Sequence, residues 1–159
     1  GPRMIRTDKQ KIHVRHTKDG RWAPDIVHCH GWFTSLLPLY LKKTFYEDPL
    51  FANAKVVYSL YNNGFETPFS KDFANKIHFD GITSEDIVSI KEKADWLNLN
   101  KLAIDQSEGI ILGEENINKD LLQYCKDKGK VILPYQGQEN YVDAYSDFYD
   151  SLLPDIEEE

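Results

Sequence analysis

Four short apolar runs, rich in β-branched residues, recur along the chain and constrain its fold more than any other feature. They cover residues 25–30, 55–61, 109–113 and 130–134. Each has the length of a strand and ends at or beside a glycine, asparagine or proline, and helix-like spacing of apolar residues follows. Strands that are apolar on both faces and alternate with helices pair in parallel and are covered on both sides. The pattern predicts an α/β fold with a Rossmann-like, three-layer parallel sheet.

The segments between and after these runs carry helix start and stop signals. We expect helices over residues 35–43, 85–96, 98–106, 116–128 and 139–153. Asn116 is the expected cap of the fourth helix, and Gly129 is expected to end it. Residues 65–82 have no clear period and predict an irregular loop. Four strands are few for an independent doubly wound domain, so the predicted sheet is incomplete.

The chain has 159 residues and a net charge of −7, and the charge is spread unevenly. Gly1 and Pro2 resemble the remnant of a cleaved affinity tag, and residues 1–20 are expected to form a flexible basic segment. Residues 21–153 are the predicted folded domain, and residues 154–159 are an acidic tail. No Lys or Arg follows Lys130. This argues against nucleic acid as a partner of the folded part, because phosphate binding needs a cationic surface.

Targeting and redox signals are equally sparse. No apolar run approaches the roughly 18–20 residues that span a bilayer, and no apolar stretch follows the charges near the N-terminus. We therefore predict no membrane partner and no signal peptide. The two cysteines, Cys29 and Cys125, are too few for a disulfide framework in a chain of this length. The expected setting is the cytoplasm.

Two histidines end the first predicted strand. His28 and His30 stand at i and i+2 and so point to one side of the strand, while Cys29 points to the other. No Asp, Glu or Cys follows at close ligand spacing, so we predict no metal and interpret both histidines as core or loop-anchoring residues. A catalytic triad can be drawn on paper from Ser59, His30 and Asp25, but no GxSxG turn supports it. The chain also has no GxGxxG or Walker loop, and we predict no cofactor.

Aromatic residues gather around the ends of the first two predicted strands. Aromatic rings can stack on the C–H faces of sugars, but they also contribute the largest side chains of hydrophobic cores. Core packing is the preferred interpretation for most of the group, which comprises Trp32, Phe33, Tyr58, Tyr61, Phe65, Phe69 and Phe73.

A longer stretch of sequence resembles a known family. Residues 22–40, WAPDIVHCHGWFTSLLPLY, are similar to the PDxxHxHDWH segment of bacterial glycogen and starch synthases of the ADP-glucose type. Residues 57–62 fall where that family has a strand ending in a His-Asn pair, and residues 98–104 resemble its NxLKxGI segment. Residues 107–111 resemble its ADxI strand. The resemblance covers residues 21–150 and is strongest to short, single-domain bacterial members.

The resemblance implies a GT-B glycosyltransferase, in which two Rossmann-like domains enclose the active site. It assigns this chain to the later part of the N-terminal, acceptor-side domain. The family transfers glucose from ADP-glucose to an α-1,4-glucan without a metal. By this resemblance His30 and Asn62 hydrogen-bond sugar hydroxyls, Trp32 packs beside them, and Lys101 attracts a phosphate or anchors a loop. Packing or loop anchoring is the alternative for each of these residues.

Departures from the family's pattern limit that expectation. Gly31 replaces an Asp, Phe33 replaces the active-site histidine, Tyr61 replaces the histidine of the His-Asn pair and Ala103 replaces a glycine. A phenyl ring cannot make the hydrogen bond that an imidazole makes to the donor sugar. The family's Lys-x-Gly-Gly loop and its nucleotide-binding C-terminal domain have no counterpart in these residues.

Three hypotheses follow. In the first, the domain is degenerate or incomplete; at most it contacts an α-glucan or malto-oligosaccharide, and it uses ADP-glucose only with a complementing domain. In the second, it is a non-catalytic interaction domain, because a sheet without its first strands exposes an edge that another chain or a second copy can pair with. In the third, it is one piece of a larger, active transferase.

Overall fold

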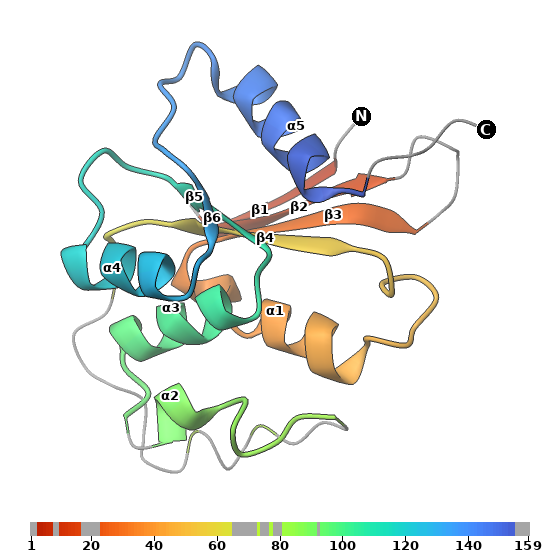
Figure 1. The fold of residues 1–159 in the computed structure, drawn as a ribbon, viewed down its shortest axis with the longest axis vertical. Helices are drawn as coiled ribbons and strands as arrows, with labels where there is room; N and C mark the ends of the chain where they lie inside the picture. The colour runs from red at the N-terminus through yellow and green to blue at the C-terminus, as the bar shows by residue number, and fades with distance from the viewer. Residues whose placement is uncertain are drawn as a thin grey trace.

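A six-stranded sheet forms the centre of the fold (Figure 1). The computed structural model describes residues 3–7, 10–16, 23–64, 73, 77, 81–91 and 93–154. In chain order the elements are β1 (Arg3–Thr7), β2 (Gln10–His16), β3 (Pro24–His30), the 3-10 turn η1 (Trp32–Thr34), α1 (Leu37–Leu39), the π-helical turn η2 (Tyr40–Thr44), β4 (Lys55–Leu60), α2 (Val88–Lys91), α3 (Trp96–Asp105), β5 (Gly109–Leu112), α4 (Lys119–Asp127), β6 (Val131–Leu133) and α5 (Tyr141–Leu152).

The four predicted strands are parallel neighbours, in the order β3-β4-β5-β6. Val27 pairs with Val56, and Tyr58 pairs with Ile110. Figure 1 shows α5 on one face of the sheet and α1, α3 and α4 on the other. The predicted three-layer α/β architecture is therefore confirmed.

Side-chain alternation along the strands divides the core between the two faces. On the α5 face, Ile26, Val57 and Ile111 form one cluster with Phe148 and Tyr149. The opposite face is filled by a larger cluster that includes Val27, Cys29, Tyr58, Leu60, Ala103, Ile104, Ile110, Leu121 and Cys125.

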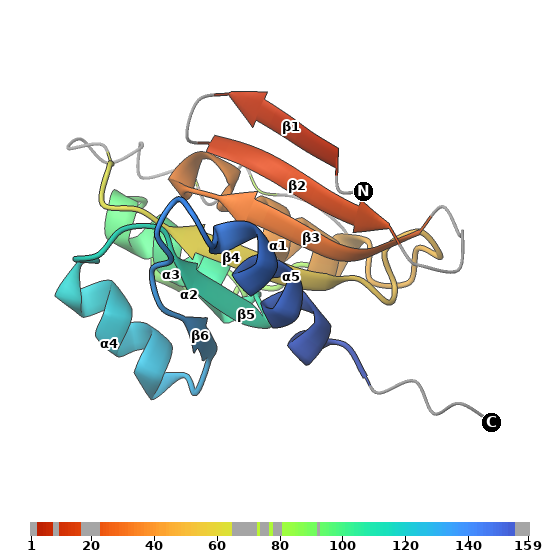
Figure 2. The same ribbon diagram turned by 90° about the horizontal axis from the view of Figure 1, so that it is seen from above.

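The basic N-terminal segment differs from its expected form. Its residues make β1 and β2, an antiparallel hairpin in which β2 pairs with β3 (Figure 2). Ile12 packs against the larger core cluster. Arg15 Nε donates to Asp25 Oδ1 at 3.0 Å and its Nη1 donates to Asp150 Oδ1 at 2.9 Å, so a charged residue is satisfied beside α5. Neither strand was expected from the sequence. In β2, distant acidic partners compensate Arg15, a polar residue that conceals the alternation of the strand.

The hairpin also changes the expected open edge. The side of β3 that the sequence predicted to be exposed is covered by β2, and the outer strands of the sheet are β1 and β6. Within the described part of the chain, every helix is too short or too polar to cross a bilayer.

Several helices are shorter than predicted. The expected helix 35–43 is divided into α1 and η2, and the expected helix 85–96 is reduced to α2. Asn118, rather than Asn116, caps α4, since its Oδ1 accepts from the backbone N–H of Asp120 at 2.9 Å. Gly129 follows the end of α4 with φ of 66°, a conformation that favours glycine.

Candidate functional site

The carboxyl end of β3 turns sharply into η1, which carries two aromatic residues, Trp32 and Phe33. Gly31 has φ of 80°, and its N–H donates to Ser59 O of the neighbouring strand at 3.1 Å. Thr34 Oγ1 closes the turn by donating to Gly31 O at 2.9 Å. A left-handed φ suits glycine and strains an L-residue, which accounts for Gly31 at this position.

The aromatic pair at this turn, Trp32 and Phe33, is called the aromatic shelf below. Trp32 is half-buried, whereas Phe33 is 71% exposed. The two rings meet edge to face, with centroids 5.7 Å apart. Among the large apolar side chains that the structure describes, Phe33 is the most exposed, so its ring is open to a ligand at this end of the sheet.

His30 is the last residue of β3, two positions before Trp32, and it is buried. It is 4% exposed, and its Nδ1 lies 2.9 Å from the hydroxyl of Tyr61. Burial raises the pKa of Tyr61, so its hydroxyl stays neutral and able to donate. The predicted contact of His30 with a sugar hydroxyl remains a prediction, and the structure gives this histidine an internal partner.

Asn62 joins two loops at the same edge. Its Oδ1 accepts from Asn118 N at 2.8 Å, and its Nδ2 donates to Asn116 O. Its own backbone N–H donates to Glu114 Oε2 at 2.6 Å. Both ends of the amide are therefore used to hold the loop after β4 against the loop after β5, which corresponds to the loop-anchoring alternative.

Lys101 lies apart from the other three predicted site residues. It is part of α3, and its Nζ lies 5.4 Å from the ring centroid of Tyr124 on α4. This cation–π contact joins two helices on one face of the sheet. His30, Trp32 and Asn62 instead lie at or just beyond the carboxyl ends of β3 and β4. The structure thus brings three of the predicted residues to one edge and gives the fourth an anchoring contact.

A buried group of histidines continues beneath this edge. The rings of His28 and His30 stack with centroids 3.9 Å apart, as their i and i+2 spacing predicts. His28 Nδ1 lies 2.5 Å from the Tyr149 hydroxyl, and its Nε2 lies 2.6 Å from Ser59 Oγ. The Tyr149 contact joins α5 to the sheet, and the Ser59 contact joins β3 to β4.

His13 joins this group, and the three histidines have nitrogens within 4.8 Å of one another. A metal-binding imidazole must direct a ring lone pair at the ion. Both ring nitrogens of His28 already contact hydroxyls, and its ring is stacked nearly parallel to that of His30, with an interplanar angle of 23°. The arrangement is that of a hydrogen-bonded core and not of a preformed metal site.

The other groups considered from the sequence have structural partners. Ser59 Oγ lies 2.6 Å from His28 Nε2, and the Asp25 carboxylate is paired with Arg15, so the structure gives the triad drawn on paper no support. Cys29 is fully buried, and burial raises its pKa to about 12, which removes it as a nucleophile.

The predicted aromatic group divides between core and edge. Tyr58 is fully buried, as core packing predicts, and Phe73 packs against a second buried cluster around Leu39. Phe65 and Phe69 lie outside the described residues.

Trp96 is an edge residue that the sequence analysis missed. Its Nε1 donates to Asn63 O at 3.0 Å, and its ring packs over Gly64, where an added Cβ would lie 2.7 Å from Nε1. Asp95 caps α3 by accepting from Asn98 N at 2.8 Å. That Asp-x-x-Asn start is the signal that could have located Trp96 at the first turn of the helix.

Comparison with known proteins gives a consistent picture. The family profile described as the starch synthase catalytic domain matches residues 10–130. The chain is similar to a glycogen synthase of Koribacter versatilis, with 44% identity over 47 residues, which are 30% of this chain and 10% of that protein. A glycogen synthase of Clostridium perfringens is 40% identical over 55 residues, or 35% of this chain and 11% of that protein.

A longer match is to a glycogen synthase of Geotalea uraniireducens, with 29% identity over 106 residues, which are 67% of this chain and 20% of that protein. The chain therefore spans a tenth to a fifth of the length of these relatives. No solved structure matches it significantly.

Proposed function

The chain belongs to the starch synthase catalytic domain family, and from that premise we propose that it contacts an α-glucan through the aromatic shelf and does not transfer glucose by itself. The observation that carries the proposal is the 71% exposure of Phe33 beside Trp32. This pair lies at the carboxyl ends of parallel strands, the edge where open α/β sheets bind their ligands. The exposed ring of Phe33 offers an apolar face to the C–H surface of a glucose unit.

The absence of autonomous transfer is proposed from the chemistry of the same edge. Sugar transfer from a nucleotide depends on charges placed around the leaving diphosphate. Phe33 stands where the family resemblance expects a histidine, and a phenyl ring makes no hydrogen bond to a donor sugar. His30 is buried against Tyr61, and the amide of Asn62 is used by the neighbouring loop. ADP-glucose would then be used only with a complementing domain.

The proposal is tested by calorimetric titration of the chain with maltoheptaose. Loss of one aromatic contact removes about 0.5–1.5 kcal/mol, so Phe33→Ala should weaken binding roughly two- to tenfold. Tyr46→Ala is the matched control, because Tyr46 is also a largely exposed aromatic, at 57%, and follows η2 rather than β3. Equal affinities of Phe33→Ala and the unaltered chain would refute contact through the shelf. Turnover of ADP-glucose by the isolated chain would refute the second half of the proposal.

A second candidate function is an interaction domain that pairs through a sheet edge. It is favoured by β6, an outer strand in which Val131 is 52% exposed. Edge strands with unpaired backbone groups are sites of strand addition. Sedimentation velocity over a hundredfold range of concentration tests self-pairing, which predicts a rising sedimentation coefficient that Val131→Lys abolishes.

The remaining expectations about partners and setting belong to this proposal as well. They are a cytoplasmic location and no nucleic-acid or membrane partner. The third hypothesis, a piece of a larger transferase, predicts ADP-glucose turnover only after a complementing domain is added.

A further inference from the structure

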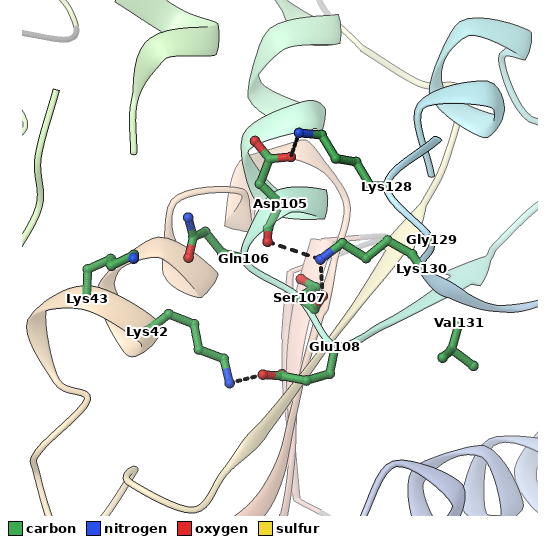
Figure 3. Close-up of a pocket in the computed structure, with 10 residues that line it drawn as sticks. All are labelled: Lys42, Lys43, Asp105, Gln106, Ser107, Glu108, Lys128, Gly129, Lys130 and Val131. Carbon is green, nitrogen blue, oxygen red and sulfur yellow. Dashed lines mark hydrogen bonds and ion pairs between the residues drawn. The ribbon is translucent and has the colours of Figure 1, made fainter. Parts of the chain in front are cut away.

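A hollow of about 500 Å³ lies at the other end of the sheet from the aromatic shelf (Figure 3). It is located at the amino ends of β5 and β6. We call it the lysine hollow, because η2 contributes Lys42 and Lys43 and the α4–β6 connection contributes Lys128 and Lys130. Figure 3 shows these side chains approaching from two sides toward the loop that joins α3 to β5.

Positive charge exceeds negative charge around the lysine hollow, although the chain as a whole carries −7. The two carboxylates that line it are Asp105 and Glu108. A third, Asp86, lies just outside, 3.3 Å from Lys43 Nζ. Four ammonium groups therefore face three carboxylates, which leaves a surplus of one positive charge. Three of the four are ion-paired: Lys42 with Glu108, Lys43 with Asp86 and Lys128 with Asp105. Such a local surplus in an acidic chain attracts anions.

Two of the ion pairs leave their lysines accessible. The Lys128 side chain is 50% exposed and lies 3.9 Å from Asp105, while the Lys43 side chain is 38% exposed. Pairs of this exposure are held weakly, because water competes for both partners. An incoming anion can therefore displace the carboxylates from these ammonium groups at a small cost in free energy.

Lys130 is held differently. Its Nζ donates to the backbone oxygens of Asp105 at 3.1 Å and Ser107 at 2.9 Å. A lysine ammonium has three N–H donors, so two serve these carbonyls and one is left for a ligand. Neutral carbonyls orient the ammonium group without cancelling its charge. Burial lowers the pKa of Lys130, and an anion in the hollow would favour its charged form.

We propose that the lysine hollow binds a phosphoryl group, either free phosphate or the phosphate ester of a small molecule, whose oxygens accept from the ammonium groups of Lys43, Lys128 and Lys130. Lysine is an effective phosphate ligand as a point charge. The hollow has the volume of a small-molecule site and is lined by the Gln106 amide as well. The site is separate from the aromatic shelf, so phosphate binding here does not depend on the proposed glucan contact.

Titration of the full ¹⁵N-labelled chain with sodium phosphate tests the proposal, with sodium chloride at equal ionic strength as the reference. Binding predicts saturable shifts of the amides of Gln106, Gly129 and Val131. Lys43→Gln combined with Lys128→Gln should weaken that binding roughly tenfold. The matched control combines Lys93→Gln with Lys119→Gln, which removes the same charge from exposed positions outside the lining of the hollow.

The source of the phosphoryl group is distinguished by a parallel titration with glycerol 3-phosphate. Tighter binding of this ester than of inorganic phosphate identifies an organic phosphate as the ligand, whereas the reverse order identifies free phosphate. The proposal is overturned if chloride reproduces the shifts, or if both double variants weaken them equally. A spectrum of each variant without phosphate verifies that its fold is unchanged.

Discussion

Replacing Tyr58 with Phe tests how α3 is fixed to the sheet. Tyr58 is fully buried on β4, and its hydroxyl donates to Asn100 Oδ1 at 2.7 Å. Asn100 is 1% exposed, and its Nδ2 donates to Trp96 O at 2.8 Å, so the pair connects the sheet to the first turn of α3. Removing the hydroxyl leaves the Asn100 oxygen buried without that donor, where water cannot replace it.

An unsatisfied buried acceptor costs about 1–3 kcal/mol. For a chain of this size, 1 kcal/mol corresponds to roughly 2–4 °C in Tm, so Tyr58→Phe should lower Tm by about 2–12 °C. Urea unfolding followed by circular dichroism gives the free energy of unfolding directly. Tyr124→Phe is the matched control, because its hydroxyl donates at 2.6 Å to Asp105, whose side chain is 25% exposed and can turn to water instead.

The two variants should therefore differ, with Tyr58→Phe the more destabilised. Asn100→Ala should also cost less in the Tyr58→Phe background than in the unaltered chain, since contacting residues couple by about 0.5–3 kcal/mol. Equal destabilisation by Tyr58→Phe and Tyr124→Phe, or full additivity with Asn100→Ala, would show that the buried bond does not hold α3.

Three further predictions concern the core. Cys29 and Cys125 should resist Ellman's reagent at pH 8 in the native chain and react fully in denaturant, because burial raises their pKa values to about 12 and about 11; rapid native labelling would contradict this. The unfolding free energy should fall as pH rises from about 9 toward 12, because the folded chain holds each thiol proton more tightly than the unfolded chain does. The expected slope is up to roughly 1.4 kcal/mol per pH unit for each thiol. Cys29→Ala should flatten that slope in urea titrations at alkaline pH. Gly109→Ala should destabilise by about 1–3 kcal/mol, because its Cβ would lie 2.8 Å from Phe148 and Leu152 of α5, whereas Gly137→Ala, with open space around it, should change Tm little.

The parallel half of the sheet was predictable because its signal is local. Each of β3 to β5 is an apolar run of mainly buried residues, and β6 is a short apolar run at the edge of the sheet. The β1–β2 hairpin lacked such evidence. The polar residue Arg15 points toward α5 and is satisfied by Asp150, a residue 135 positions away that no local pattern links to it.

In the candidate site, too, some features follow from the local sequence and others depend on distant contacts. The alternation rule correctly predicted that His28 and His30 lie on one side of β3. Their hydroxyl partners come from β4, its following residue and α5, and those pairings depend on the assembled fold. The position of Lys101 beside Tyr124 likewise depends on how α3 packs against α4, which the matched sequence segment does not encode.

The central claim is that the chain contacts an α-glucan at the aromatic shelf. Its most direct test is an amide NMR spectrum of the labelled chain recorded with increasing maltoheptaose. The account predicts saturable shifts of the Trp32 indole and of the Gly31, Phe33 and Asn62 amides, with little change at Lys101. A well-dispersed spectrum in which these signals do not shift when maltoheptaose is added would contradict it.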